Sequence, residues 1–185
     1  SAVRAMTTLR QILGNGAPHP MGSPENDAVR ERIEKELTRI GLAPRVLSRT
    51  VCSPYGVCGE VKNVVAVLPS SASPRAILLA SHYDSVPAGP GAADDGAAVA
   101  SMLEIARILK NGAPLLHPIV FLFDDGEELG LLGAEAFVRE EEFKSVDLEF
   151  LFTHESFSAE EAEEFKSVDL VLNLEARGTS GANLM

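Results

Sequence analysis

The sequence predicts an α/β fold, a three-layer α/β/α sandwich with a mostly parallel central sheet. Three short apolar runs, at residues 76–80, 119–123 and 170–174, are typical of strands that are buried on both faces of a sheet. Helical patterns separate these runs along the chain. Because strands that alternate with helices favour a parallel sheet covered by helices, the pattern predicts this fold class.

The first half of the chain predicts two helices and a β-hairpin. The stronger helix follows the N-cap Ser23, has Pro24 at its first position and ends at Gly41. A shorter helix is expected over residues 1–13. The hairpin is expected from two β-rich stretches, at residues 45–51 and 61–68. Apolar periodicity predicts two later helices, at residues 97–110 and 131–139.

The two cysteines, Cys52 and Cys58, flank a turn-rich stretch between the predicted hairpin strands. A turn there would bring them within disulfide distance, which would indicate an oxidising compartment. Two unpaired thiols in a loop remain the alternative. The pair alone lacks two of the four ligands of a structural zinc site.

Length and charge limit the organisation and the partners. With 185 residues and 45% apolar content, we expect one domain over residues 1–185. The net charge of −11 argues against nucleic acid as a partner, because phosphate binding needs a basic surface. The chain begins at Ser1 and ends in a strand-like pattern, so we expect a partial domain of a longer protein.

An eight-residue sequence, Glu-Glu-Phe-Lys-Ser-Val-Asp-Leu, occurs at residues 141–148 and again at 163–170. Two copies are too few for a solenoid. We therefore expect a duplicated, acidic surface insertion at about residues 142–163, helical in part and without a catalytic role.

Charged side chains follow all three predicted buried strands. His82 and Asp84 follow the first, Glu127 and Glu128 the second, and Glu175 the third. Because ligands of open α/β sheets bind at the carboxyl ends of the strands, we expect these side chains to meet. Asp94 and Asp95 are expected to open the helix over residues 97–110, where the helix dipole favours carboxylates.

So many carboxylates at one edge need a cation, because neighbouring negative charges raise each other's pKa. Imidazole and carboxylate ligands without thiolate suit zinc, with manganese or cobalt as substitutes. Each piece alone has a simpler interpretation. His82 alone resembles an ordinary core histidine, Asp94 a helix cap, and Glu127 part of a solvated turn. Their order and shared position favour a metal site.

The candidate residues lie within four longer motifs. These are His82-Tyr83-Asp84-Ser85-Val86, Gly91-Ala92-Ala93-Asp94-Asp95-Gly96, Asp125-Gly126-Glu127-Glu128-Leu129-Gly130-Leu131-Leu132-Gly133 and Asn173-Leu174-Glu175-Ala176-Arg177-Gly178. Together they resemble the M28 family of zinc aminopeptidases, in particular its membrane-anchored members. The resemblance covers the chain except the insertion, and it implies the zinc-dependent exopeptidase fold.

The resemblance implies two zinc ions per complete site. His82 and Glu175 would bind one ion, Glu128 the other, and Asp94 would bridge both. It also implies a further histidine ligand from a loop well after Glu175. Neither His117 nor His154 occupies a matching position, so we expect an incomplete and inactive site in the chain as it stands.

The resemblance also implies roles for Glu127 and Asp84. Glu127 would be the general base that activates a metal-bridging water for attack on the scissile carbonyl. Asp84 would orient His82 through a hydrogen bond. The peptide bond between Asp94 and Asp95 is commonly cis in the family.

The implied function is removal of N-terminal residues from peptides with a free N-terminus. The implied location is extracytoplasmic, that is periplasmic, lumenal or secreted, with membrane anchoring only through segments outside this chain. Two alternatives stay open. One is a glutaminyl-cyclase-like acyltransferase that uses a single zinc, and the other is a non-catalytic interaction module with the same fold.

Overall fold

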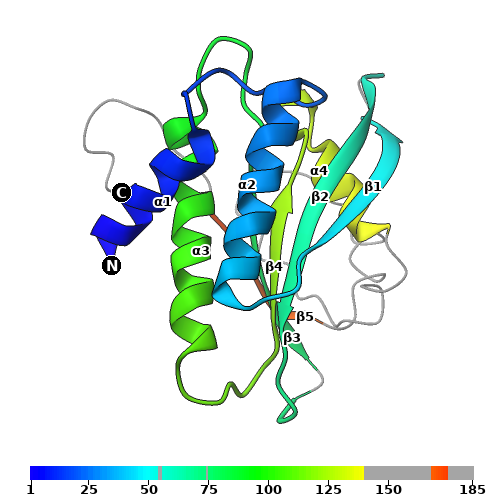
Figure 1. Ribbon diagram of the computed structural model, residues 1–185. Helices are drawn as coiled ribbons and strands as arrows, with labels where there is room; N and C mark the ends of the chain where they lie inside the picture. Colours follow the sequence, from blue (N-terminus) through cyan, green and yellow to red (C-terminus); the bar gives the residue numbers. More distant parts are fainter. Residues whose placement is uncertain (54–55, 74, 140–167, 175–185) are drawn as a thin grey trace, which may run out of the picture.

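The computed structural model describes residues 1–53, 56–73, 75–139 and 168–174 (Figure 1). One mixed sheet has the strand order β1-β2-β4-β3-β5, flanked by helices α1 to α4. The strands are β1 (Arg45–Cys52), β2 (Cys58–Leu68), β3 (Ala76–His82), β4 (Ile119–Asp124) and β5 (Val168–Asn173). The helices are α1 (Ala2–Leu13), α2 (Pro24–Ile40), α3 (Ala97–Lys110) and α4 (Leu132–Val138). The predicted α/β class is confirmed.

The sheet is less parallel than the sequence predicted. β3 pairs in parallel with both β4 and β5, whereas β2 is antiparallel to both β1 and β4. The hairpin of β1 and β2 was itself predicted, so the difference lies in the antiparallel pairing of β2 with β4. The parallel part is therefore β4, β3 and β5.

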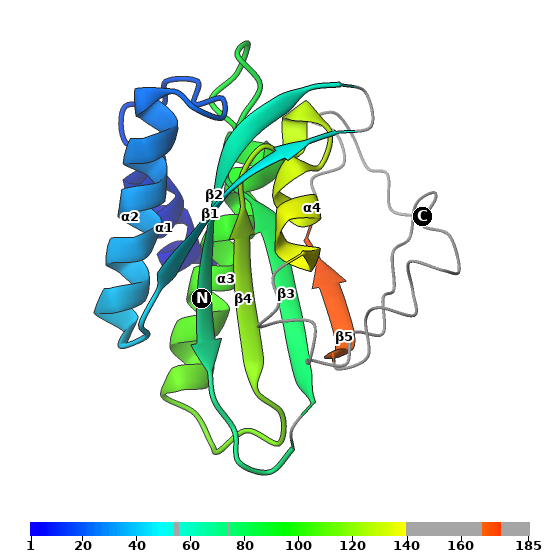
Figure 2. The same ribbon diagram turned by 90° about the vertical axis from the view of Figure 1, so that its right-hand side faces the viewer.

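Helices cover both faces of the sheet, with α1, α2 and α3 on one face and α4 on the other (Figures 1 and 2). Alternating residues of β4 show the two faces. Phe121 and Phe123 pack in the larger core under α1 to α3, whereas Val120 and Leu122 pack with Phe137 of α4. Every residue of β4 is buried, which explains its continuous apolar pattern.

The local signals of α2 act as the sequence predicted. The Asn26 backbone amide donates to Ser23 Oγ at 3.1 Å, so Ser23 is the N-cap. Gly41 ends the helix in a left-handed conformation with φ of 91°, which glycine adopts without a Cβ clash.

The predicted surface insertion at about residues 142–163 lies outside the described residues.

The hairpin of β1 and β2 carries a disulfide. Cys52 and Cys58 are register partners at its end, and their sulfur atoms are bonded. This decides between the two alternatives that the sequence left open, in favour of the disulfide.

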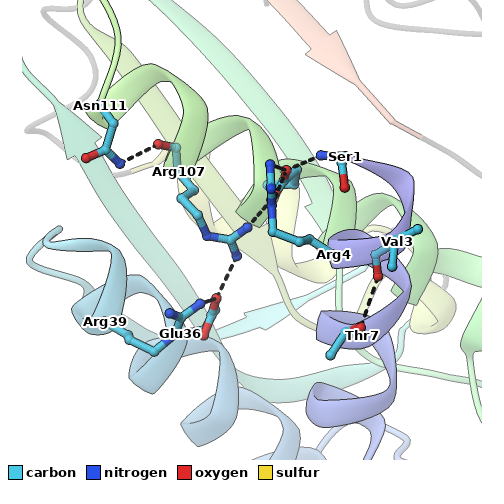
Figure 3. A network of polar contacts seen from close by, with 9 residues as sticks. Ser1, Val3, Arg4, Thr7, Glu36, Arg39, Arg107 and Asn111 are labelled. Atoms are coloured by element: carbon cyan, nitrogen blue, oxygen red, sulfur yellow. Dashed lines mark hydrogen bonds and ion pairs between the residues drawn. The ribbon is translucent and has the colours of Figure 1, made fainter.

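A network of ion pairs joins α1, α2 and α3 on the outer side of the larger core (Figure 3). Arg107 of α3 donates to Glu36 of α2 at 2.9 Å and also contacts Glu104. Arg4 of α1 donates to the same Glu104 at 2.7 Å. These partners lower the pKa of Glu104 to about 2, with the hydrogen bond from Arg4 as the largest cause. The network holds the three helices together away from the predicted metal site.

Within the described part of the chain, no helix combines the length and the apolar character that a membrane span requires.

Candidate metal centre

The predicted site residues begin at the carboxyl edge of the parallel strands. His82 ends β3 and pairs in register with Asp124, which ends β4. The Tyr83 amide donates to the Asp124 carbonyl at 2.9 Å, so the two chains leave the sheet together. The segments after both strands therefore start from the same place, as the sequence predicted.

The His82 imidazole is buried, with its two nitrogen atoms in different surroundings. Nδ1 lies 3.1 Å from the Asp84 carbonyl oxygen and 3.3 Å from Asp84 Oδ1. Both neighbours are acceptors, so we assign the ring proton to Nδ1. Nε2 then carries the lone pair, and it points to Asp94 Oδ1 at 3.2 Å and Glu127 Oε2 at 3.9 Å.

Asp94 reaches the imidazole from an irregular turn, Ala92–Gly96, that precedes α3. The expectation that Asp94 and Asp95 open the helix is wrong. Asp94 has φ of −116° and ψ of 96°, the Asp94–Asp95 peptide bond is cis, and α3 begins at Ala97. The Asp94 side chain is 55% exposed, whereas Asp95 is buried, so only Asp94 faces the open side of the site.

Gly91 starts this turn at a point where no side chain fits. It has φ of 60°, and a Cβ there would lie 2.9 Å from the Ser85 Cβ and 3.1 Å from the Asp94 carbonyl oxygen. The close approach lets the Asp94 turn lie against the segment after β3. It thereby contributes to bringing Asp94 within reach of His82.

Glu127 and Glu128 lie in a short turn after β4, Glu127–Leu129, that Gly126 opens with φ of 72°. Both backbone amides point to Asp84. The Glu127 amide donates to Oδ1 at 3.1 Å and the Glu128 amide to Oδ2 at 3.3 Å. Asp84 thus contacts the imidazole and the glutamate turn at once, although the sequence indicated only the first contact.

Three predicted metal ligands come together in the structure. His82, Asp94 and Glu128 each offer one ligand atom, and these atoms lie within 4.8 Å of one another. A lone pair on His82 Nε2 that faces carboxylate oxygens is stabilised by a cation between them. One imidazole nitrogen with carboxylate oxygens is also a donor set typical of zinc. The described residues therefore fit a divalent metal ion.

The remaining sequence candidates lie elsewhere or outside the described residues. Glu175 and His154 belong to the second group, so their predicted roles stay predictions. His117 precedes β4 at the opposite end of the strand, and its Nδ1 lies 3.1 Å from the Arg75 carbonyl oxygen. Its position agrees with the expectation that it is not a ligand.

Two buried carboxylates next to the site were not among the sequence candidates. Burial raises the pKa of Asp124 to about 7, with His82 opposing the rise and Asp84 adding to it. Burial also raises the pKa of Asp125 to about 6, and Asp84 adds to that rise. The available signal was their position directly after a fully apolar strand, where burial is expected.

A family model described as Peptidase family M28 matches residues 63–185. Among curated relatives, the vacuolar membrane protease of Candida dubliniensis is 33% identical over 139 residues, which is 70% of this chain and 15% of that protein. The vacuolar membrane protease of Candida albicans is 36% identical over 132 residues, which is 70% of this chain and 16% of that protein. The chain thus spans about 15% of the length of these relatives.

Solved structures share the fold. The glutaminyl cyclase of Porphyromonas gingivalis matches with a TM-score of 0.67 and 26% identity, covering 76% of this chain and 54% of that chain. A Zn-dependent exopeptidase from Parabacteroides distasonis matches with a TM-score of 0.66 and 22% identity, covering 76% of this chain and 56% of that chain. The second match shows the fold alone.

Proposed function

The chain belongs to peptidase family M28, and on that premise we propose that it is the metal-binding part of a zinc aminopeptidase. The observation that carries the proposal is the meeting of His82, Asp94 and Glu128 with ligand atoms within 4.8 Å of one another. Family, fold and donor set all support a hydrolase that uses a metal ion. That the enzyme removes N-terminal residues is a more specific statement than metal-dependent hydrolysis, and it is part of the proposal.

In the proposed site, the ligand atoms of His82 and Asp94 lie 3.2 Å apart, and Glu128 completes the described group. Glu175 is proposed as a further ligand on its sequence position after the third strand. We propose two zinc ions with Asp94 between them. Zinc held there would act as a Lewis acid that polarises the scissile carbonyl and lowers the pKa of water.

Glu127 is the proposed general base. Its side chain is 26% exposed and points to the same open side as His82 Nε2. Its carboxylate would accept a proton from the attacking water and donate that proton to the leaving amine when the peptide carbon–nitrogen bond breaks. Asp84 would keep the Glu127 backbone in place during these transfers, because it accepts the Glu127 amide hydrogen bond.

The free N-terminus of a peptide is the proposed recognition element. Glu127, which is not among the proposed zinc ligands, presents a carboxylate that is 26% exposed, so an incoming ammonium group meets negative charge at the site. N-acetylation of a peptide substrate would remove this attraction. The proposed enzyme should therefore cleave the free peptide much faster than its acetylated form.

The disulfide and the relatives support an extracytoplasmic location for this part of the protein. The Cys52–Cys58 disulfide is expected to persist in an oxidising compartment. Both curated relatives described above are named vacuolar membrane proteases. We propose membrane anchoring through segments outside this chain.

The test compares Glu127→Gln with Glu128→Gln in the full-length protein. For Glu127→Gln we expect kcat on aminoacyl amides to fall by about 10²- to 10⁴-fold while the zinc content stays that of the wild type. For Glu128→Gln we expect loss of zinc as well as activity. Activity of Glu127→Gln near that of the wild type would contradict the proposal.

Cyclisation of N-terminal glutamine is the second candidate, because a glutaminyl cyclase shares the fold at 26% identity. A peptide with N-terminal glutamine separates the two reactions. The aminopeptidase releases free glutamine and the shortened peptide, whereas a cyclase releases ammonia and keeps the peptide chain whole. Absence of sub-micromolar zinc binding by the full-length protein would instead support a non-catalytic module.

A further inference from the structure

Asn26 is a buried polar residue of α2 that the proposed mechanism does not use. It is 1% exposed and lies in the first turn of the helix. Its backbone amide meets the N-cap Ser23, so helix capping does not engage its side chain. The side-chain amide instead donates to Asp125 Oδ1 at 3.1 Å, across 99 positions of sequence.

Asp125 stands two residues before Glu127 and is itself 1% exposed. Its Oδ2 accepts the Lys62 backbone amide of β2 at 3.1 Å, and its own backbone amide donates to Asn63 Oδ1 at 3.0 Å. Hydrogen bonds from β2 and α2 thus hold Asp125, which directly precedes the turn that contains Glu127 and Glu128. Loss of one of these donors leaves an oxygen of a buried carboxylate without its hydrogen bond, which is unfavourable.

The same Asn26 side-chain amide also approaches the segment between α1 and α2, which contacts the loop after β3. Asn26 Nδ2 lies 3.4 Å from the His19 carbonyl oxygen, which accepts the Ser85 amide at 3.3 Å. The His19 amide in turn donates to Ser85 Oγ at 2.8 Å, next to Asp84. One amide group therefore connects the glutamate turn with the loop that carries Asp84.

We propose that Asn26 is a positioning residue, which sets the Glu127 and Glu128 turn through Asp125 without contact with metal or substrate. This inference rests on the proposed function for its effect on zinc, but the hydrogen bonds exist in either case. Residues that support metal ligands in this way typically change metal affinity by 10- to 100-fold when they are lost.

The experiment uses the full-length protein and reverses the donor and the acceptor. In Asn26→Leu, a side chain of similar size replaces the amide, so the hydrogen bond to Asp125 is lost. In the double variant Asn26→Asp with Asp125→Asn, the new amide donates to the new carboxylate and its oxygen still accepts from Lys62. Glu25→Gln is the matched control, because Glu25 is an exposed residue of the same helix turn.

Zinc affinity is measured by competition with a chromophoric chelator. The protection of the Glu127 and Glu128 backbone amides is measured by hydrogen–deuterium exchange. We expect Asn26→Leu to lower zinc affinity about tenfold or more and to speed that exchange. The double variant should recover most of both, and Glu25→Gln should match the wild type.

Unchanged zinc affinity and exchange in folded Asn26→Leu would overturn the inference. Equal losses in the single and double variants would also overturn it, because the reversed hydrogen bond would then have no effect. If the wild type binds no zinc, the proposed function fails. The amide exchange of Glu127 and Glu128 then decides alone whether Asn26 positions their turn.

Discussion

The Asp84 carboxylate accepts the backbone amide of Glu127 at 3.1 Å. The same oxygen lies 3.3 Å from His82 Nδ1, and the second oxygen accepts the Glu128 amide at 3.3 Å. One buried carboxylate thus fixes the imidazole after β3 and the glutamate turn after β4. Its importance for the site should exceed that of a residue that only orients a histidine.

Asp84→Asn tests this relationship. The asparagine side chain keeps one acceptor oxygen, but its NH2 group replaces the other. Because every neighbour of the Asp84 carboxylate named above is a hydrogen-bond donor, at least one hydrogen bond is lost. We expect zinc affinity to fall by about 10- to 100-fold, measured by isothermal titration calorimetry. Asp27→Asn is the control, because Asp27 pairs with Arg30 and Lys62 at the surface. Equal zinc affinity in Asp84→Asn and the control would contradict the assignment.

Gly133→Ala should disturb the same turn from the α4 side. A Cβ at Gly133 would lie 2.4 Å from the Asp125 carbonyl oxygen and 2.7 Å from its amide nitrogen, so the backbone must move. We expect a loss of about 1–3 kcal/mol in unfolding free energy, together with weaker zinc binding. Gly89→Ala is the control, since its Cβ would meet only Val86 at 3.9 Å. Urea unfolding that shows no difference between the variants would refute this packing argument.

Acid should weaken the helix network through Glu104. Arg4 is the first cause that lowers the pKa of Glu104 from 4.5 to about 2. A carboxyl with a lowered folded-state pKa stabilises the fold above its unfolded pKa, and this contribution disappears as pH falls from 4.5 toward 2. The full shift corresponds to about 3 kcal/mol, which solvent screening reduces to about 1 kcal/mol because Arg4 is largely exposed.

The measurement compares urea unfolding at about pH 6 and about pH 3 for the wild type and Glu104→Gln. The stability lost on acidification should be smaller in Glu104→Gln than in the wild type. Glu31→Gln, whose side chain is 71% exposed, should keep the wild-type pH dependence. The same pH dependence in all three proteins would show that Glu104 does not contribute.

The Cys52–Cys58 disulfide closes a short loop, with a sequence separation of six between the cysteines. Loop-closure entropy gives about 2 kcal/mol for a loop of this length. We expect the double variant Cys52→Ser, Cys58→Ser to lose at most about that much unfolding free energy and to keep wild-type zinc affinity. Loss of zinc binding in the folded double variant would mean that the hairpin end supports the site.

The strand ends and their charged residues could be predicted because both signals are local in the sequence. Continuous apolar runs gave β3 and β4, and the residues that follow them had to meet once the strands were parallel neighbours. The same local reasoning misplaced Asp94. A helix dipole favours acidic residues in the first turn, but a non-helical turn precedes α3 and places Asp94 against His82.

Asn26 and Asp125 could not be recognised in the same way. Asn26 is a polar residue on the buried face of α2, and its partner lies 99 residues later. No local pattern indicates such a pairing, because it depends on how α2 packs beside the end of β4. The antiparallel pairing of β2 with β4 is also a long-range property, which explains why the sheet was predicted to be more parallel than it is.

Anomalous diffraction at the zinc absorption edge, from crystals of the full-length protein, tests the proposed metal centre most directly. We predict an anomalous peak within about 2.3 Å of His82 Nε2 and of a carboxylate oxygen of Asp94. A second peak about 3.5–4 Å away, next to Glu128, would give the proposed stoichiometry of two. Crystals grown with excess zinc that show no peak between His82, Asp94 and Glu128 would contradict the account.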